Sequence, residues 1–226
     1  MSTRSSRFML EPEAIAMLEK YGIPYPAHGV ARDKTEAGVI AEKLGFPVVM
    51  KVISPQVPHK SDAGGVLVNL GSKVAVEQAW ETITRNVKTA VPDAAIEGML
   101  VCTQAPEGVE SIVGCLEDVS LGATLMFGLG GIFAEILKDV AFRSIPLSRL
   151  DAEEMIREIN GFPLLNGARG KEPVDLESLT SLLLSAARLF SDNPDFAEMD
   201  LNPVRLYPQG IMVLDARILV AGQDDA

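Results

Sequence analysis

The chain has 226 residues, of which 47% are hydrophobic and 23% charged, a composition typical of a folded globular protein. The formal net charge of −11 argues against binding to nucleic acid, because phosphate contacts need a basic face. The first residues lack the apolar run of a signal peptide, and no stretch reaches the ~20 apolar residues of a membrane span. We therefore expect a cytoplasmic protein that acts away from membranes.

The N-terminal part of the chain is expected to alternate helices and strands after a disordered leader at residues 1–9. Proline in a first turn and glycine just past a last turn mark the helix boundaries. A continuous apolar run predicts a buried strand at 47–53, and the loop 54–65 after it is rich in proline, glycine and serine. The expected elements are helices at 11–20, 35–44 and 72–90 and strands at 25–30, 47–53, 66–70 and 96–104.

The C-terminal part of the chain shows both periodicities again. The expected elements are strands at 109–117, 124–127 and 132–137, helices at 151–160 and 175–190, and a closing hairpin at 196–206 and 211–220. Residues 161–173 are interpreted as a loop. Cys102 and Cys115 match no metal-ligand spacing and are interpreted as buried apolar residues. Because strands and helices are mixed and hairpins are present, the expected class is α+β rather than a doubly wound parallel sheet.

Lys51 is the single charged residue inside the apolar strand 47–53. A buried ammonium is costly unless an anion meets it, so two interpretations stay open. The side chain either snorkels or pairs with a core carboxylate, or it faces a cleft and meets a phosphate. The next loop adds His59, Lys60 and the pair Gly64-Gly65, which together suit an anion. The alternative for His59 is an ordinary surface histidine.

The closing hairpin carries a second polar group of residues. Asp200 and Asn202 alternate with apolar residues and therefore share one face of a strand. A two-residue turn at 208–209 would place Asn202 opposite Asp215, and oxygen ligands of this kind suit Mg²⁺. A turn at 209–210 would still keep Asp215 on that face. The alternative is a solvated polar face, and a bulge would shift the register.

These motifs, taken in order, resemble a known family. The segments are PVVMKVISPQVPHKSDAGGV, IEGMLVCTQAPEGVESIVG, FGLGGIFAEILKDVAFRSIPL, and EMDLNPVRL followed by VLDARI. They resemble the ATP-grasp subunit of ADP-forming acetyl-CoA synthetases and, more distantly, the β subunit of succinyl-CoA synthetase. The resemblance covers residues 8–220 and implies an ATP-grasp fold, two α+β lobes with a nucleotide cleft between them. The implied domain is 10–220, with a lobe boundary near 100–105 and a tail at 221–226.

The resemblance also implies roles for individual residues. Lys51 would meet the ATP phosphates, residues 97–104 would read adenine, and Glu110 would bind the ribose hydroxyls. His59 is similar to a histidine proposed to relay the phosphoryl group. The implied nucleotide contacts are Lys51, Lys60, Gly64, Gly65, Val101, Gln104, Glu110 and Gly130, and the implied Mg²⁺ ligands are Asp200, Asn202 and Asp215.

The implied activity is the reversible conversion of an acid, CoA and ATP into acyl-CoA, ADP and phosphate, through an acyl phosphate and a phosphohistidine. In this family the main phosphohistidine and the CoA-binding domain belong to an α subunit, so we expect an α partner in an α2β2-type assembly. Two alternatives are a stand-alone ATP-grasp ligase, which usually carries a further N-terminal domain, and a module that senses nucleotide without turnover. The second should have lost Lys51, His59 or the carboxylates, all of which are present.

Overall fold

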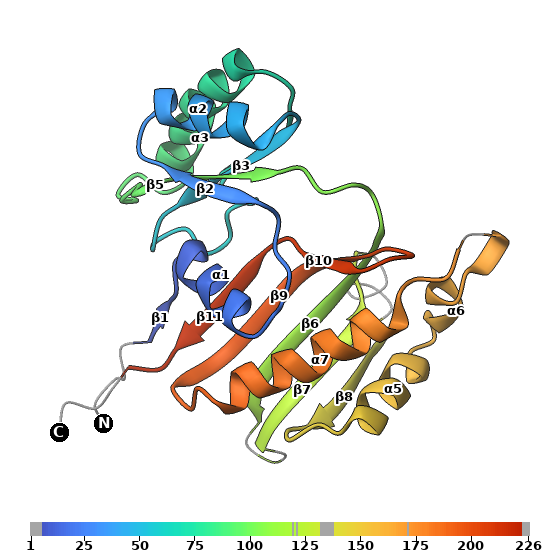
Figure 1. Cartoon of the computed structure of the whole chain (residues 1–226). Helices are drawn as coiled ribbons and strands as arrows, with labels where there is room; N and C mark the ends of the chain where they lie inside the picture. Colours follow the sequence, from blue (N-terminus) through green and yellow to red (C-terminus); the bar gives the residue numbers. More distant parts are fainter. Residues whose placement is uncertain (1–5, 119, 121, 132–137, 171, 223–226) are drawn as a thin grey trace. The chain divides into compact units, whose positions relative to one another are not determined.

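The computed structural model describes residues 6–118, 120, 122–131, 138–170 and 172–222. The chain forms two compact units, which are described one at a time (Figure 1). The smaller unit comprises Leu10–Pro12 and Pro26–Pro106, and the larger comprises Met1–Met9, Glu13–Tyr25 and Glu107–Ala226. A single boundary does not describe this division, because residues 13–25 group with the larger unit although they lie between two segments of the smaller one.

The smaller unit is an antiparallel sheet with two helices packed on it (Figure 1). Its strand order is β2-β5-β3-β4, with β2 at His28–Ala31, β5 at Gly98–Thr103, β3 at Val48–Ile53 and β4 at Val66–Leu70. Helix α2 spans Lys34–Leu44 and helix α3 spans Lys73–Ala90. The apolar face of α3 is buried through Val76, Ala79, Ile83 and Val87, as its helical spacing predicts.

Helix starts in this unit follow the capping rules. The Asp33 side chain accepts hydrogen bonds from the amides of Thr35 and Glu36, and Ser72 accepts one from Ala75. These caps satisfy amides that have no partner inside their own helix.

The larger unit is an antiparallel sheet with the strand order β1-β11-β9-β6-β7-β8, and β10 also pairs with β9. The strands are β1 Arg7–Phe8, β6 Val109–Asp118, β7 Gly122–Leu129, β8 Val140–Ser144, β9 Phe196–Leu206, β10 Ile211–Val213 and β11 Ala216–Val220. The helices are α1 Glu11–Lys20, α5 Arg149–Glu158, α6 Phe162–Leu165 and α7 Leu176–Ser191, with a 3-10 turn at Ala168–Gly170.

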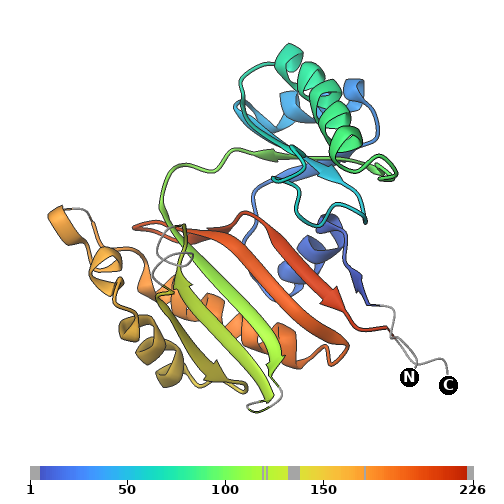
Figure 2. The ribbon, with the colours of Figure 1, turned by 180° about the vertical axis from the view of Figure 1, so that it is seen from behind.

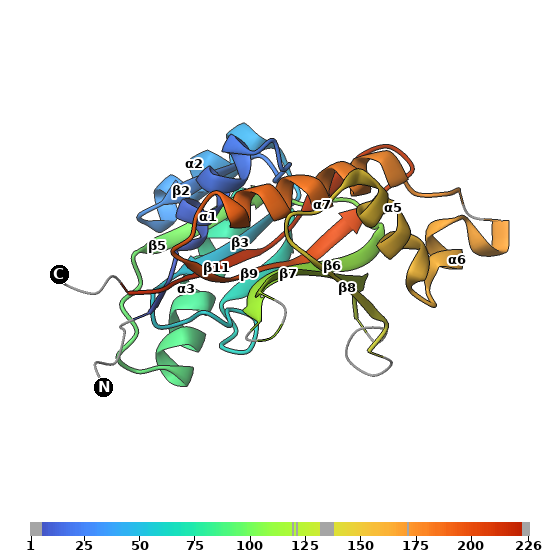
Figure 3. The same ribbon diagram turned by 90° about the horizontal axis from the view of Figure 1, so that it is seen from below.

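Helices α5 and α7 lie on the same side of this sheet (Figure 3). Seen from behind, the strands lie in front of both helices (Figure 2). The buried face of α7 includes Leu179, Leu183 and Ala186, which pack with Val113, Phe127 and other side chains of the sheet. None of the helices in the described part of the chain is long and apolar enough to cross a membrane.

Several expectations need correction. Residues 7–9 are not a disordered leader, because β1 pairs with β11 and the Met9 amide donates to the Ile218 carbonyl at 2.8 Å. Strand β8 was not expected, and the expected loop 161–173 contains α6 and the 3-10 turn. The second strand of the closing hairpin is divided into β10 and β11. The strand expected at 132–137 lies outside the described residues, as do residues 1–5 and 223–226.

Candidate functional site

Lys51 lies in the middle of strand β3, with Leu100 of β5 on one side and Val66 of β4 on the other. Its ammonium Nζ is 2.6 Å from Oε1 of Glu11, the first residue of α1. Nζ of Lys60 is 3.3 Å from the other oxygen of the same carboxylate. The side chains of the three residues are only 9%, 2% and 9% exposed for Lys51, Glu11 and Lys60. The carboxylate that a buried lysine requires is therefore Glu11.

Glu11 was missed from the sequence because it lies 40 positions before Lys51, in a segment that shows only a helix start. The signal that could have found it is indirect. A lysine inside a buried strand needs an anionic partner. A glutamate at the start of a helix with an apolar face, such as Glu11, is a candidate for that partner.

The loop after β3 turns tightly around Lys60. The amide of Gly65 donates to the Lys60 carbonyl at 2.7 Å, and the amide of Gly64 donates to the Ser61 carbonyl at 3.0 Å. Gly64 has φ +62°, and a Cβ on Gly65 would lie 2.6 Å from Cγ1 of Val52. Both positions need glycine for the turn itself. Their role as nucleotide contacts stays a prediction, although both amides already donate within the loop.

His59 begins this turn, and its side chain is exposed. Its backbone carbonyl accepts the Ala63 amide at 3.4 Å, so the turn that fixes Lys60 also fixes the backbone at His59. The structure thus brings His59, Lys60 and Lys51 into one region of the smaller unit. His59 is exposed and directly precedes Lys60 in the chain, and its role in phosphoryl chemistry stays a prediction.

The segment expected to read adenine contains two residues with different environments. Val101 is fully buried in the middle of β5, and that strand is paired on both sides with β2 and β3. Its side chain therefore belongs to the core of this unit, and its assignment as a nucleotide contact stays a prediction. Gln104 lies at the end of the strand, where its Oε1 accepts the Asn69 amide at 2.6 Å. Its side chain anchors the end of β4, and its nucleotide role stays a prediction.

In the larger unit, strands β6 and β9 bring Glu110 next to Arg205, and their side chains form an ion pair at 3.1 Å. The Gly130 amide donates to the Glu110 carbonyl at 2.8 Å. Glu110 and Gly130, which are 20 residues apart in sequence, are therefore neighbours. The Glu110 side chain is exposed, so its carboxylate can accept hydrogen bonds from a ligand while Arg205 stays beside it.

The closing hairpin has the register that a turn at 208–209 predicts. The Tyr207 amide donates to the Gly210 carbonyl at 3.2 Å, Leu206 pairs with Ile211, and Leu201 pairs with Ala216. Asn202 consequently lies opposite Asp215, with its amide 3.1 Å from the Asp215 carbonyl oxygen.

The cross-strand neighbour of Asp200 is a cation, whereas that of Asp215 is Asn202. Asp200 pairs across the strands with Arg217, whose guanidinium is 3.9 Å from its carboxylate. Within the described residues, no group of three or more His, Cys, Asp or Glu side chains is placed to hold a metal ion. The role of Asp200, Asn202 and Asp215 as Mg²⁺ ligands stays a prediction, and Mg²⁺ commonly binds proteins through few side chains.

Asp175 shows how the same unit fixes its covering helix. Its carboxylate caps α7 by accepting from the Ser178 amide at 2.9 Å, and it also accepts from the Gly210 amide at 2.9 Å. Hydrogen bonds from the Ser178 amide and hydroxyl, followed by the Gly210 amide, lower the pKa of the Asp175 carboxyl. The Asp175 carboxylate therefore connects the start of helix α7 to the turn of the closing hairpin.

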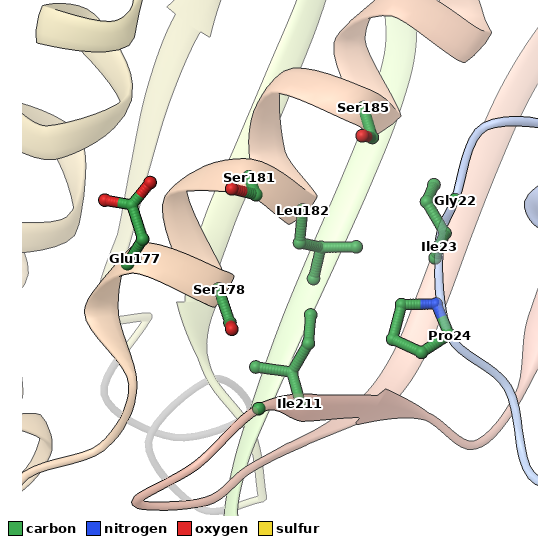
Figure 4. A pocket seen from close by; sticks show the side chains of 10 residues that line it. Gly22, Ile23, Pro24, Glu177, Ser178, Ser181, Leu182, Ser185 and Ile211 are labelled. Carbon is green, nitrogen blue, oxygen red and sulfur yellow. The ribbon is translucent and has the colours of Figure 1, made fainter.

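A surface hollow of about 350 Å³ lies beside that cap in the larger unit. Figure 4 shows serines of α7 on one side of it and Ile23, Pro24 and Ile211 on the other. The lining residues are Gly22, Ile23, Pro24, Glu177, Ser178, Ser181, Leu182, Ser185, Gly210 and Ile211. None of the site residues predicted from the sequence is among them.

The sequence matches the model of an ATP-grasp domain family over residues 1–220, and the chain belongs to that family. The β subunit of acetate–CoA ligase [ADP-forming] I from Pyrococcus furiosus is 44% identical over 215 residues, 95% of this chain and 93% of the relative. The chain therefore belongs to the β subunits of ADP-forming acyl-CoA synthetases, nucleotide-binding subunits of ligases. The predicted family, fold class, function and enzyme class are confirmed.

Solved structures agree with this assignment. One is the dinucleotide-forming acetyl-coenzyme A synthetase 1 of Ca. Korarchaeum cryptofilum with coenzyme A, Ca-AMPCP and HgCl+. It is 51% identical, with a TM-score of 0.92, and the match covers 95% of this chain and 93% of that one. Another structure of that enzyme contains coenzyme A and Mg-AMPPCP, with a phosphohistidine segment pointing towards the nucleotide binding site. It is 47% identical, with a TM-score of 0.82 and the same coverage.

Proposed function

We propose that this chain binds Mg·ATP or Mg·ADP and transfers the terminal phosphoryl group in an ADP-forming acid–CoA ligase. The reaction joins an acid, CoA and ATP to give acyl-CoA, ADP and phosphate. The observation that carries the proposal is the buried pair of Lys51 and Lys60 on the Glu11 carboxylate. Two ammonium groups meet at one position, and ammonium groups are common phosphate contacts, even on a chain with a net charge of −11.

Lys51 and Lys60 are proposed to contact the phosphates, with Gly64 and Gly65 shaping the loop that carries Lys60. Glu110 is proposed to accept from the ribose hydroxyls, with Gly130 beside it. The exposed Glu110 carboxylate supports this, because an ionised carboxylate is a strong acceptor for paired hydroxyl groups. Gln104 is proposed to contact the base from its strand end.

Asn202 and Asp215 are proposed to hold Mg²⁺, and their opposed positions on the hairpin support this assignment. Asp200 is proposed as an outer residue of the same site, because Arg217 faces its carboxylate. Mg²⁺ held by these residues would neutralise part of the charge of the nucleotide phosphates. The protein's own contribution is to hold the two oxygen-bearing side chains, Asn202 and Asp215, opposite each other on the paired strands.

A partner α subunit is proposed to supply CoA binding and the main phosphohistidine in an α2β2-type cytoplasmic enzyme. The Korarchaeum structure with a phosphohistidine segment pointing towards its nucleotide site supports this arrangement. We propose that His59 relays the phosphoryl group. A ring nitrogen of His59 would attack phosphorus as the partner's N–P bond breaks. A terminal oxygen of ADP would then attack, breaking the His59 N–P bond and giving ATP.

The proposal is tested by titrating the chain alone with Mg·ATP and Mg·ADP while following thermal unfolding. At a nucleotide concentration 100 times Kd, single-site binding should stabilise the chain by about 2.7 kcal/mol. The chain alone should form no acyl-CoA, and addition of the partner subunit should restore ligation. An unfolding temperature that does not respond to any adenine or guanine nucleotide would contradict the proposal.

The relay is tested separately with His59→Asn in the reconstituted enzyme. Asparagine keeps a hydrogen-bonding group but removes the nucleophile. Acyl phosphate should still form from acyl-CoA and phosphate, whereas ATP synthesis from ADP should fall by a factor of about 100 or more. His28→Asn, at the only other histidine in the chain, is the matched control and should change neither half-reaction. ATP synthesis near the parental rate in His59→Asn would show that His59 carries no phosphoryl group.

A further inference from the structure

Glu11 is the least exposed charged group in the lysine cluster, and it comes from a different segment than either lysine. Its side chain is 2% exposed, against 9% for Lys51 and 9% for Lys60. One carboxylate oxygen is 2.6 Å from Lys51 and the other is 3.3 Å from Lys60. The carboxylate thus bridges strand β3 and the loop 54–65, using both of its oxygens.

The electrostatics of the cluster depend on that bridge. Each buried ammonium has lost most of its hydration, and two like charges in a low-dielectric site disfavour each other. A carboxylate in contact with both ammonium groups offsets their mutual repulsion. The carboxylate therefore lets two ammonium groups lie together at one place, where both can contact an anion.

The backbone on each side of the cluster is fixed as well. Lys51 lies in a strand with neighbours on both sides, and Lys60 accepts the Gly65 amide in a turn that packs on Val52. The long lysine side chains are then the parts with the most freedom to move. A shared carboxylate restricts both, which reduces the entropy that a phosphate must remove on binding.

We propose that Glu11 is a positioning residue for nucleotide phosphates, acting through Lys51 and Lys60. The inference rests on the proposed phosphate role of these two lysines. Glu11 itself is not proposed to touch the phosphate, because two anions in contact would repel and its side chain is only 2% exposed. Its contribution is to hold the two ammonium groups close together.

The test is a pair of double-mutant cycles on nucleotide affinity in the full chain. Calorimetric titration with Mg·ADP would compare the parent with Glu11→Gln, Lys51→Met, Lys60→Met and the two double variants that contain Glu11→Gln. We expect Glu11→Gln to weaken Mg·ADP binding about tenfold, or ~1.4 kcal/mol. In the Lys51→Met or Lys60→Met background the same change should cost clearly less, since its target is gone. Glu42→Gln, which breaks the exposed pair with Lys73, is the control and should leave affinity unchanged.

Each outcome decides something. If Lys51→Met and Lys60→Met bind as well as the parent, the proposed phosphate contacts fail and the inference fails with them. If the lysine variants bind weakly while Glu11→Gln binds normally or more tightly, only the positioning role is overturned. Fully additive effects in both cycles would also overturn it, because Glu11 would then act independently of both lysines.

Glu11→Asp keeps the test valid if the glutamine variant does not fold. Aspartate retains the charge but is one methylene shorter, so it cannot keep both contacts. We expect an intermediate loss of affinity, a few-fold, with the same non-additivity toward the lysine variants. Fluorescence of Trp80, the single tryptophan and part of the smaller unit, reports whether each variant is folded. Parental affinity in a folded Glu11→Asp variant, together with additive cycles, would contradict the proposal.

Discussion

The lysine cluster of the smaller unit (Lys51, Lys60 and Glu11) and the closing hairpin of the larger unit differ in how their charged groups are stabilised. Lys51 and Lys60 are buried, so their charges must be compensated inside the protein, and Glu11 does this. Asn202 is exposed and Asp215 half-buried, so water can solvate their oxygens before a cation arrives. The charges of the first site are compensated by a partner inside the protein. The polar side chains of the second site are accessible to water, and the strand pairing only sets their positions. Substitutions in the two regions should therefore have different consequences for stability.

The largest expected effect is on the stability of the smaller unit. Glu11→Gln should lower its free energy of unfolding by about 3 kcal/mol, because the change removes a carboxylate from two buried ammonium groups. Urea unfolding followed by Trp80 fluorescence measures this. Breaking the exposed Lys73–Glu42 pair with Glu42→Gln should cost under ~1 kcal/mol. Equal losses for the two variants would abolish the contrast between buried and exposed charge.

The hairpin should respond in the opposite way. Asp215→Asn removes a charge from a hydrated site, so Mg²⁺-dependent binding of ADP should weaken about tenfold while stability changes by less than ~0.5 kcal/mol. Titrations with and without Mg²⁺ give the affinity, and urea unfolding gives the stability. Asp195→Asn, at an exposed position of the same unit, is the control. A variant that unfolds more easily but binds Mg·ADP normally would make Asp215 a structural residue.

A smaller effect is expected at the cap that joins α7 to the hairpin turn. Asp175→Ala should lower the stability of the larger unit by about 1 kcal/mol, the usual loss for an N-cap. Because the folded-state pKa of Asp175 is lowered, its contribution is present above the unfolded pKa of about 3.9 and is lost as the pH falls through the folded value. Hydrogen exchange of α7 amides at pH 7 and pH 3 would check this. Equal protection of parent and variant at pH 7 would refute the cap's role.

The smallest effect is expected at the two cysteine thiols, which should not react with a disulfide reagent while the chain is folded. Burial raises the pKa of the Cys115 thiol to about 12, so at pH 8 almost none is thiolate. Cys102 is also buried. Neither should react with a disulfide reagent in the native chain, and both should react after unfolding in urea. Fast labelling of the native chain would show that one of the two strands opens readily.

Sequence reasoning predicted the parts of the site that follow from local patterns. Lys51 stood out because a charge interrupted an apolar strand, and the two-residue turn gave the correct pairing of Asn202 with Asp215. Glu11 was missed because its partner is set by tertiary structure, which no local period encodes. Val101 was included because the family motif covers the whole strand, whereas core packing, which no motif records, buries its side chain.

The fold was predictable to a similar degree and for similar reasons. Helices with capping residues and apolar faces, such as α2, α3 and α7, were expected close to their observed bounds. Strand β1 has two residues and exists only because β11 supplies its hydrogen bonds, so no local signal marks it. The register of the closing hairpin is continuous across the break between β10 and β11, since both pair with β9 as one strand would.

The central claim is that Lys51 binds nucleotide phosphate, and calorimetric titration of Lys51→Met with Mg·ADP tests it most directly. Methionine keeps the length of the buried stem and removes the charge. Lys34→Met, which removes a lysine from an exposed ion pair in the same unit, is the control and should bind like the parent. The account predicts an affinity at least about tenfold weaker for Lys51→Met in a folded chain. Parental affinity in that folded variant would show that Lys51 serves only to pair with Glu11, and would contradict the account.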